Sequence, residues 1–277
     1  MSEISRVCSK HGIKWFADCG TLLGAVRHEG YIPWDDDLDI YMLRSDWEKF
    51  FEVAGNELPE GYEILSMRNH EDYKEIVGRI VSRRSIDYSL GQLEEYYGCP
   101  YAVGVDIFPL DNLYEDETRE KVRLEQTKEL VEEYERLKAN GSDDRELRLR
   151  IERLYSECSD KEASKVALMP FYISNGDHIY SKELFDCICE LSFENTYINA
   201  PGRYEEVLEI EYGDFMQVVK SGGAHDYPVY SKQEEILREK LGRNPYRYTL
   251  DSKQLLKAVG RYVSKLTAPV EKKAMGK

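Results

Sequence analysis

The sequence predicts an α/β or α+β fold, in which a β-sheet core is flanked by helices. Three observations favour this fold class. Residues 1–113 alternate short β-rich runs with helical stretches, residues 114–168 are dense in charge with apolar residues at helical spacing, and residues 169–277 return to a strand pair followed by helix. The chain contains no internal repeat and no long Pro/Gly/Ser-rich linker, so we expect these segments to form one unit.

Residues 1–113 are expected to contribute most of the sheet. Runs rich in β-branched and aromatic residues predict strands, and apolar residues at helical spacing predict two helices between them. The predicted strands span residues 13–18, 38–42, 62–67, 76–81 and 102–108, and the predicted helices span residues 21–27 and 46–54. Strands and helices that alternate along a chain are typical of such a sheet core.

The next segment is predicted to be helical. Residues 122–137 space their apolar residues as an amphipathic helix, Gly141 ends it, and residues 143–155 begin another. We interpret the pair as a helical hairpin or lid with a solvated, charged face.

The last segment is predicted to begin with strands. Residues 189–201 form a hairpin that turns near Glu194, and residues 203–212 form a helix that ends at Gly213. A final helix is expected over residues 251–266.

The composition argues against several classes of protein. With 38 Lys and Arg against 53 Asp and Glu, the formal net charge is −15, which disfavours binding to nucleic acid or anionic membranes by bulk charge. The absence of any run of 18 apolar residues excludes a membrane-spanning helix, and the first ten residues lack the apolar core of a signal peptide. The six cysteines include no C-x-x-C pair and are interpreted as reduced thiols, with structural metal ligation as the alternative. We therefore expect a cytoplasmic protein.

The most informative segment is the acidic run 34–42, W-D-D-D-L-D-I-Y-M. In an extended segment Asp35, Asp37 and Asp39 point to one face, because side chains alternate along a strand. Like charges on one face destabilise the fold unless a cation balances them, and carboxylate oxygens suit Mg²⁺ or Mn²⁺. The alternative is a solvated acidic turn after Pro33, which gives no reason for Asp39 to lie within an apolar strand. A calcium-binding EF-hand loop is rejected, because its Gly and Glu positions do not match.

A third carboxylate is expected from a neighbouring strand. Asp106, in G-V-D-I-F-P-L-D, is flanked by apolar residues, and a charge in such a strand needs a partner. Asp106 is therefore a candidate third metal ligand. The alternative is a structural aspartate at the end of a strand, a role that Asp111 fits better.

A strand-to-helix junction upstream is a candidate phosphate site, although neither G-x-G-x-x-G nor a P-loop motif is present. Gly20 lets backbone N–H groups approach a ligand, Thr21 can donate a hydroxyl, and a helix N-terminus favours an anion. Arg27 is a candidate phosphate ligand, with pairing to an acidic neighbour such as Glu29 as an equal alternative. His225, in G-G-A-H-D-Y, is a candidate nucleotide or phosphate ligand, and a loop histidine that caps a backbone group is its alternative.

The run W-F-A-D-C-G-T-L-L-G-A-V-R-H-E-G-Y-I-P-W-D-D-D-L-D-I closely resembles the signature of the LicD family. Two later segments agree with it, V-D-I-F-P-L-D and F-E-N-T-Y-I-N-A-P followed by Y-E-E-V-L-E-I-E-Y-G-D-F. Members are phosphotransferases with a nucleotidyltransferase fold, related to fukutin-type ribitol-phosphate transferases. The resemblance implies an α+β fold with a nucleotidyltransferase-like mixed sheet in residues 1–113. Residues 114–168 remain the charged helical hairpin or lid predicted above, and residues 169–277 would complete the same catalytic unit.

The resemblance also implies an activity. The enzyme would move a phospho-head group, phosphocholine or a similar one, from a CDP-linked donor to a sugar hydroxyl of a glycan acceptor and release CMP. The acceptor would be a cell-surface glycan such as lipopolysaccharide or teichoic acid, and peripheral contact with a lipid-linked acceptor is compatible with this activity. Nucleic acid is not an expected partner.

Family roles carry over to individual residues by position. Asp37 and Asp39 would hold Mg²⁺, with Mn²⁺ as a substitute, and Asp106 would join them or act as the base. Gly20 and Thr21 would hold phosphate.

One predicted strand departs from the family pattern. Arg79 and Val81 stand where the family usually has Lys followed two residues later by Arg, and Ser85 stands where Thr is common. Arg79 remains a candidate nucleotide or phosphate ligand, but its contacts to the nucleotide or head group would differ.

Two alternatives stay open from the residues alone. The same carboxylates could serve a nucleotidyltransferase that releases pyrophosphate, because metal-assisted phosphoryl chemistry is common to both reactions. A catalytically silent protein that binds metal or glycan is the other alternative. The released product, CMP or pyrophosphate, distinguishes the two enzymes.

Overall fold

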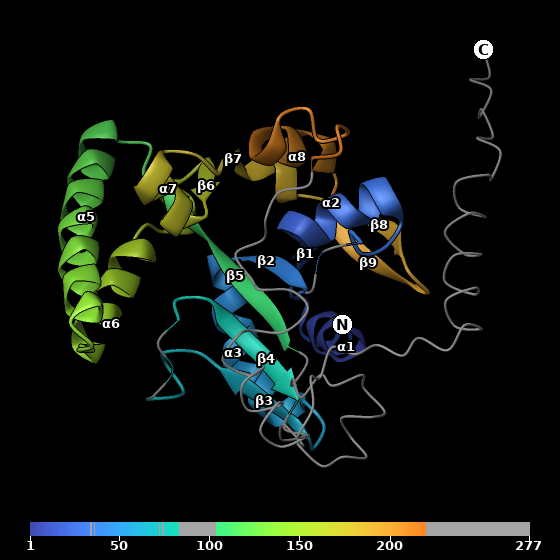
Figure 1. Ribbon diagram of the computed structural model, residues 1–277, viewed down its shortest axis with the longest axis horizontal. Coiled ribbons are helices and arrows are strands. Elements are labelled where there is room, and N and C mark those ends of the chain that lie inside the picture. The colour runs from blue at the N-terminus through green and yellow to red at the C-terminus, as the bar shows by residue number, and fades with distance from the viewer. Residues whose placement is uncertain (34, 36, 72, 74, 83–103, 220–277) are drawn as a thin grey trace, which may run out of the picture. The chain divides into compact units, whose positions relative to one another are not determined.

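A mixed β-sheet lies at the centre of the protein. The computed structural model describes residues 1–33, 35, 37–71, 73, 75–82 and 104–219 (Figure 1). Within them the sheet has the strand order β1-β2-β5-β4-β3, with β6 pairing to β5 and β7 to β6. The strands are β1 (Phe16–Ala17), β2 (Asp39–Leu43), β3 (Tyr62–Leu65), β4 (Gly78–Ser82), β5 (Gly104–Leu113), β6 (Lys165–Ala167) and β7 (Ile179–Ser181). Only β2 and β5 pair in parallel among these strands, which makes the sheet mixed.

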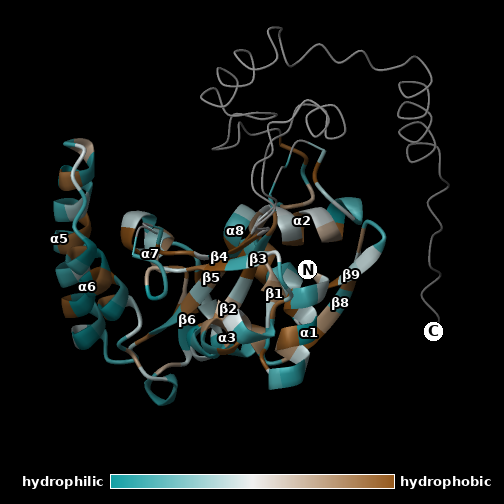
Figure 2. Cartoon of the chain, turned by 90° about the horizontal axis from the view of Figure 1, so that it is seen from below, coloured by the Kyte–Doolittle hydropathy of each residue, from teal (hydrophilic) through white to brown (hydrophobic). Residues whose placement is uncertain are grey.

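Helices cover both faces of this sheet. Helices α1 (Ser2–His11) and α3 (Arg44–Glu57) lie on one face, and α2 (Cys19–His28) and α8 (Tyr204–Tyr212) lie on the other (Figure 2). A sheet covered on both faces needs a strand that is apolar on both sides. Strand β2 meets this requirement, since Ile40, Tyr41 and Met42 are all fully buried.

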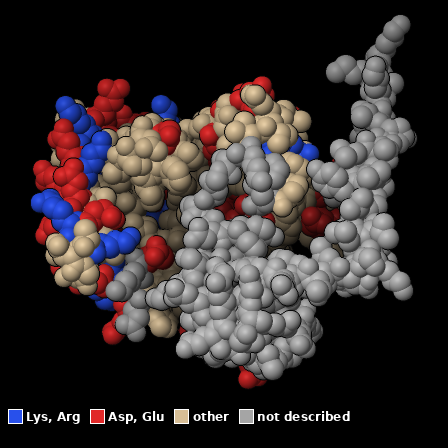
Figure 3. Space-filling model, viewed as in Figure 1, with Lys and Arg blue, Asp and Glu red and all other residues tan. Residues whose placement is uncertain are grey.

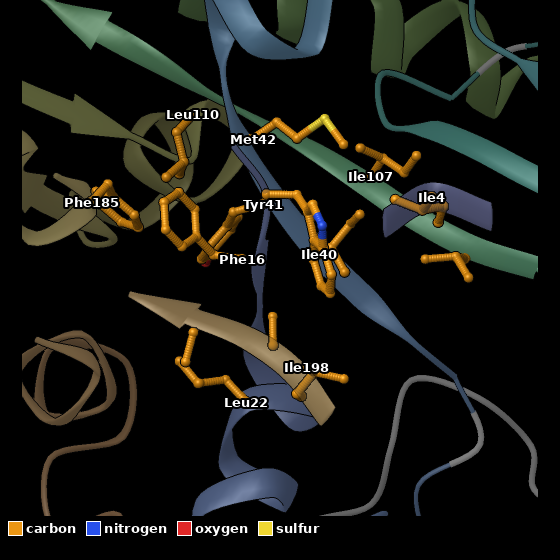
Figure 4. Packing of buried hydrophobic residues seen from close by; sticks show 14 of the residues in the cluster. Ile4, Phe16, Leu22, Ile40, Tyr41, Met42, Ile107, Leu110, Phe185 and Ile198 are labelled. Carbon is orange, nitrogen blue, oxygen red and sulfur yellow. The ribbon is translucent and has the colours of Figure 1, made fainter. Parts of the chain in front are cut away.

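The core is built around β2. On one side of the strand, Phe16, Tyr41 and Phe185 pack edge to face, with ring centroids 5.4 Å apart for Phe16–Phe185 and 6.4 Å for Tyr41–Phe185 (Figure 4). From α3, Trp47 donates its indole N–H to the carbonyl oxygen of Ile107 at 3.0 Å. The ring contacts pack β1 and β2 against the segment that carries Phe185, and the indole hydrogen bond joins α3 to β5.

A helical hairpin lies at the far end of β5. It consists of α5 (Glu117–Ala139) and α6 (Arg145–Tyr155), and α7 (Met169–Asn175) packs nearby (Figure 1). Its inner side joins a second apolar cluster that includes Leu147, Ile151 and Tyr155. Its outer surface intersperses basic and acidic side chains (Figure 3), as a solvated helical face does.

A separate two-stranded hairpin follows, formed by β8 (Ile188–Phe193) and β9 (Thr196–Pro201). It turns at Glu194, which adopts a left-handed φ of 54°. The next helix, α8, ends at Gly213, whose φ of 65° is one that glycine adopts without strain. Short 3₁₀ turns cover Asp160–Glu162 and Lys182–Phe185.

The fold class predicted from the sequence is confirmed: the structure is α+β with a mixed sheet. The helices and strands predicted between residues 21 and 212 are present with shifted ends. The sequence analysis missed α1, although buried Ile4, Val7 and Cys8 have amphipathic spacing, and it missed β6, β7 and α7. The predicted helix over residues 251–266 lies outside the described residues, and the division into residues 1–113, 114–168 and 169–277 stays a prediction.

Two strand predictions need correction. The strand predicted over residues 13–18 is only Phe16–Ala17, and β2 begins at Asp39, so Asp35 and Asp37 precede the strand. Strand alternation therefore does not align these two carboxylates with Asp39.

None of the helices in the described part of the chain combines the length and the apolar character needed to span a membrane.

Candidate active site

Three adjacent strands place an aspartate pair and an arginine side by side. Strand β2 pairs in parallel with β5 so that Asp39 is opposite Asp106, and β4 pairs with β5 so that Arg79 is opposite Asp106. Residues opposite one another in paired strands project to the same face of a sheet. The register therefore brings Asp39 and Asp106 together, as the candidate metal site requires.

Arg79 neutralises Asp106 in this structure. The guanidinium Nε donates to Oδ1 of Asp106, and Nη2 donates to Oδ2 at 2.5 Å. Such a two-point pair is the strongest geometry between arginine and a carboxylate. The hydrogen bond to Asp106 raises the pKa of Arg79, so the guanidinium stays charged. Arg79 thus occupies the oxygens with which Asp106 would bind a cation.

Asp39 lies in a strongly negative environment. Burial raises the pKa of its carboxyl to about 8, and nearby carboxylates add to this shift. These carboxylates belong to Asp37, Asp106 and Asp35. Arg79 lowers the pKa but offsets only part of the shift. Carboxylates crowded in this way favour a bound cation.

The acidic loop approaches the start of α2 at Gly20. A Cβ atom on Gly20 would lie 2.3 Å from Oδ2 of Asp35, so only a residue without a side chain leaves room for this carboxylate. The sequence predicts that Gly20 lets a phosphate approach the backbone. In the structure the space beside Gly20 holds Asp35, and phosphate binding at Gly20 stays a prediction.

Replacing Gly20 by alanine is expected to displace Asp35 and weaken cation binding, because the new methyl group and the carboxylate cannot share the space. Mn²⁺ titration followed by electron paramagnetic resonance measures the effect. Gly55→Ala in α3 is the matched control: its Cβ meets nothing within 4 Å. That variant should bind Mn²⁺ normally and gain about 0.5–1 kcal/mol of stability, because alanine is the better helix former. Equal Mn²⁺ affinity in the two variants would contradict the expectation.

Thr21 holds the first residue of β2. Its side chain is buried, and its hydroxyl oxygen accepts the backbone N–H of Asp39 at 2.9 Å. The carbonyl oxygen of Asp39 in turn accepts the N–H of Asp18 at 3.0 Å. Thr21 therefore positions Asp39, and its predicted contact with phosphate stays a prediction.

Two further candidates lie apart from the carboxylates or outside the described residues. Arg27 donates from Nη1 to the carbonyl oxygens of Phe215 and Gln217, at 3.1 Å and 3.3 Å. It thereby ties the end of α2 to the segment after α8. His225 lies outside the described residues, and so does Ser85.

Asp111 has a structural role, but it lies inside β5 and forms an ion pair there, whereas the sequence suggested an aspartate at the end of a strand. It is buried and accepts two hydrogen bonds from Arg44, Nε to Oδ1 at 2.6 Å and Nη2 to Oδ2 at 2.9 Å. Glu152 binds the same guanidinium at 3.0 Å. This buried network joins α3, β5 and α6 at a distance from the acidic loop.

The structure also reveals a cluster that the sequence analysis missed. Among the described residues, one group of three potential metal ligands has donor atoms within 4.8 Å of one another: Asp18, Cys19 and Glu211. The predicted ligands Asp37, Asp39 and Asp106 do not form such a group, because their donor atoms do not all lie within 4.8 Å of one another. Arg79 binds the carboxylate of Asp106 instead. The signal in the sequence was Asp18 itself, a charge that directly follows the apolar run W-F-A.

Comparisons with known proteins add a family context. Residues 12–89 match the LicD/FKTN/FKRP nucleotidyltransferase domain. Over 240 residues, 76% of this chain and 85% of the relative, the chain is 27% identical to the lipopolysaccharide cholinephosphotransferase LicD of Haemophilus influenzae. Two uncharacterized Rickettsia proteins match shorter stretches. The R. typhi protein is 42% identical over 64 residues, which are 23% of this chain and 21% of that protein. The R. prowazekii protein is 50% identical over 46 residues, 17% of each.

Proposed function

We propose that this chain, whose residues 12–89 belong to the LicD family, transfers a phospho-head group from a CDP-activated donor to a sugar hydroxyl of a cell-surface glycan and releases CMP. Phosphocholine is the head group we favour, because the Haemophilus relative is a cholinephosphotransferase. The observation that carries the proposal is the pairing of Asp39 with Asp106 beside an acidic loop.

The side chains fit a divalent cation. All candidate ligands are carboxylates, which suit Mg²⁺ or Mn²⁺; burial, with their crowding as a further cause, raises the pKa of Asp39 to about 8. Asp37 and Asp39 would hold the ion, and Asp106 would join them or act as the base. When bound, such an ion neutralises negative charge on the diphosphate of the donor.

Arg79 and Asp106 would have different roles in the reaction, phosphate binding for Arg79 and cation binding or proton transfer for Asp106. Arg79 holds both carboxylate oxygens of Asp106 here, and its guanidinium would be available for a phosphate of the donor if Asp106 served as a cation ligand. If Asp106 is the base, its carboxylate accepts the proton of the attacking sugar hydroxyl. Positioning of the donor by charged groups then supplies most of the barrier reduction.

The experiment is a product analysis. The full-length protein is incubated with Mg²⁺, CDP-choline and a panel of lipopolysaccharide and teichoic acid acceptors, and the products are resolved by mass spectrometry. We expect CMP together with a glycan that has gained phosphocholine. No release of CMP from CDP-choline or from other CDP-alcohols would overturn the proposal. With a nucleoside triphosphate as donor, release of pyrophosphate would instead support a nucleotidyltransferase.

A further inference from the structure

The first turn of α2 and the last turn of α8 bring together three side chains that the proposed reaction does not use. They are Asp18, Cys19 and Glu211, and one donor atom from each lies within 4.8 Å of the others. Asp18 is fully buried. Two carboxylates that meet inside a protein repel each other, so their proximity requires a compensating group.

Among the residues that the structure describes, no group is placed to hydrogen-bond with the carboxylate of Asp18. It occupies the N-cap position of α2, where an aspartate usually accepts an N–H from the first turn of the helix. Here it makes no capping hydrogen bond, and both carboxylate oxygens are buried without an acceptor role. The side chain is therefore directed into the cluster and away from the helix end. An unpartnered buried carboxylate strongly destabilises a fold, so it points to a ligand.

Glu211 is oriented by two phenols. Its Oε1 accepts the hydroxyl protons of Tyr180 at 2.9 Å and Tyr41 at 3.1 Å, while its Oε2 is buried without a partner. Neutral phenols orient the carboxylate but do not balance its charge. Within the described ranges, neither Glu211 nor Asp18 forms an ion pair with a basic side chain. Carboxylates that bind metal ions are often oriented in this way: hydrogen bonds hold one oxygen, and the other oxygen is left for the metal.

We propose that Asp18, Cys19 and Glu211 form a binding site for a divalent transition-metal ion of the Zn²⁺ type. Sulfur ligands favour Zn²⁺ over Mg²⁺, and Zn²⁺ accepts carboxylate ligands as well. Zinc bond lengths of about 2.0–2.3 Å put tetrahedral ligand atoms roughly 3.3–3.8 Å apart, so small side-chain rotations close the observed spacing. The bound ion balances the two carboxylates, and the Cys19 thiol loses its proton to the solvent as the sulfur–metal bond forms.

The site lies next to the acidic loop but shares no proposed ligand with it, and the proposal does not depend on the proposed function. The cluster joins the start of α2 to the end of α8, and Tyr41 of β2 contacts it through Glu211. Its link to the candidate active site is the hydrogen bond from the N–H of Asp18 to the carbonyl oxygen of Asp39. A metal ion here would therefore have a structural role and would fix the backbone that carries Asp39.

The test uses Co²⁺ as a spectroscopic substitute for Zn²⁺. Full-length protein is stripped with a chelator and titrated with Co²⁺ under reducing conditions, and the near-ultraviolet band that thiolate gives with cobalt is recorded. We expect one equivalent to produce the band, Zn²⁺ to abolish it, and Zn²⁺ to raise the melting temperature. No band, or a band unaffected by Zn²⁺, would overturn the proposal.

Variants assign the ligands. Cys19→Ser should lose the band, whereas Cys187→Ser, which alters an exposed thiol, should keep it. Glu211→Gln preserves the acceptor for both phenols and should weaken Zn²⁺ binding by at least 10–100-fold, so it serves if Cys19→Ser does not fold. Asp39→Asn should keep the band. An intact band in both Cys19→Ser and Glu211→Gln would contradict the assignment even if the phosphotransferase activity is established.

Discussion

Replacing Asp39 by asparagine is expected to lower turnover of CDP-choline by about a thousandfold, on the order of 4 kcal/mol of transition-state stabilisation. Asparagine keeps the shape of the side chain and removes the charge that would hold the cation. The backbone N–H that bonds to Thr21 is unchanged, so β2 keeps its position. Initial rates of CMP release, measured at saturating Mg²⁺, give the size of the effect.

The same variant is not expected to lose stability. The folded state raises the pKa of Asp39 to about 8, so the folded protein retains a proton that the unfolded chain releases near pH 4. Without divalent ions, this contribution to wild-type stability is complete below about pH 4 and is lost as the pH rises through about 8. In thermal melts between pH 5 and 8, the melting temperature of Asp39→Asn should therefore fall less with rising pH than that of the wild type. Asp186→Asn, at an exposed position, is the control for both activity and melting. Full activity of Asp39→Asn would remove Asp39 from the site.

Replacing Arg44 by methionine is expected to lower the free energy of unfolding by about 3–5 kcal/mol. Arg44 is buried with Asp111 and Glu152, and its loss leaves the carboxylate of Asp111 inside the protein without its charge partner. The attraction within a buried pair barely exceeds the cost of removing both charges from water, but a single remaining charge is strongly unfavourable. Urea unfolding followed by circular dichroism measures the change.

An exposed ion pair provides the contrast. Arg203 pairs with Glu206 and Glu183 on the surface, and Arg203→Met should leave the unfolding midpoint almost unchanged, because solvent screens exposed pairs. A similar loss of stability in Arg203→Met and Arg44→Met would show that the Arg44 network has no special role.

Local patterns in the sequence were sufficient to predict most elements. The hairpin of β8 and β9 was predicted together with its turn at Glu194, because alternating strands that flank a polar pair leave few other conformations. Helix α1 was missed although its spacing was present, since it lies at the chain start without a capping residue. The short strands β6 and β7 gain their stability from pairing with β5, and such pairing is not encoded locally.

The proximity of Asp39 and Asp106 could also be predicted, because a charged residue within an apolar strand needs a partner. The ion pair between Arg79 and Asp106 could not, since it depends on the antiparallel register of β4 and β5. The prediction that strand alternation places Asp35 and Asp39 on one face was wrong, because β2 begins only at Asp39.

The cluster that contains fully buried Asp18 and partly buried Glu211 could not be predicted from the sequence, for another reason. Its members are 211 − 18 = 193 residues apart in the chain. They meet only because α2 and α8 pack on the same face of the sheet. Contacts between residues so far apart in the chain depend on tertiary packing, and no local spacing in the sequence predicts them.

We propose that the carboxylates beside β2 and β5 bind a divalent cation together with the diphosphate of the donor. The decisive measurement is Mn²⁺ binding, followed by electron paramagnetic resonance with and without CDP-choline. We predict that CDP-choline tightens Mn²⁺ binding in the wild type and that this tightening disappears in both Asp39→Asn and Asp106→Asn. Mn²⁺ affinity that is indifferent to CDP-choline, or a tightening that survives in both variants, would contradict it.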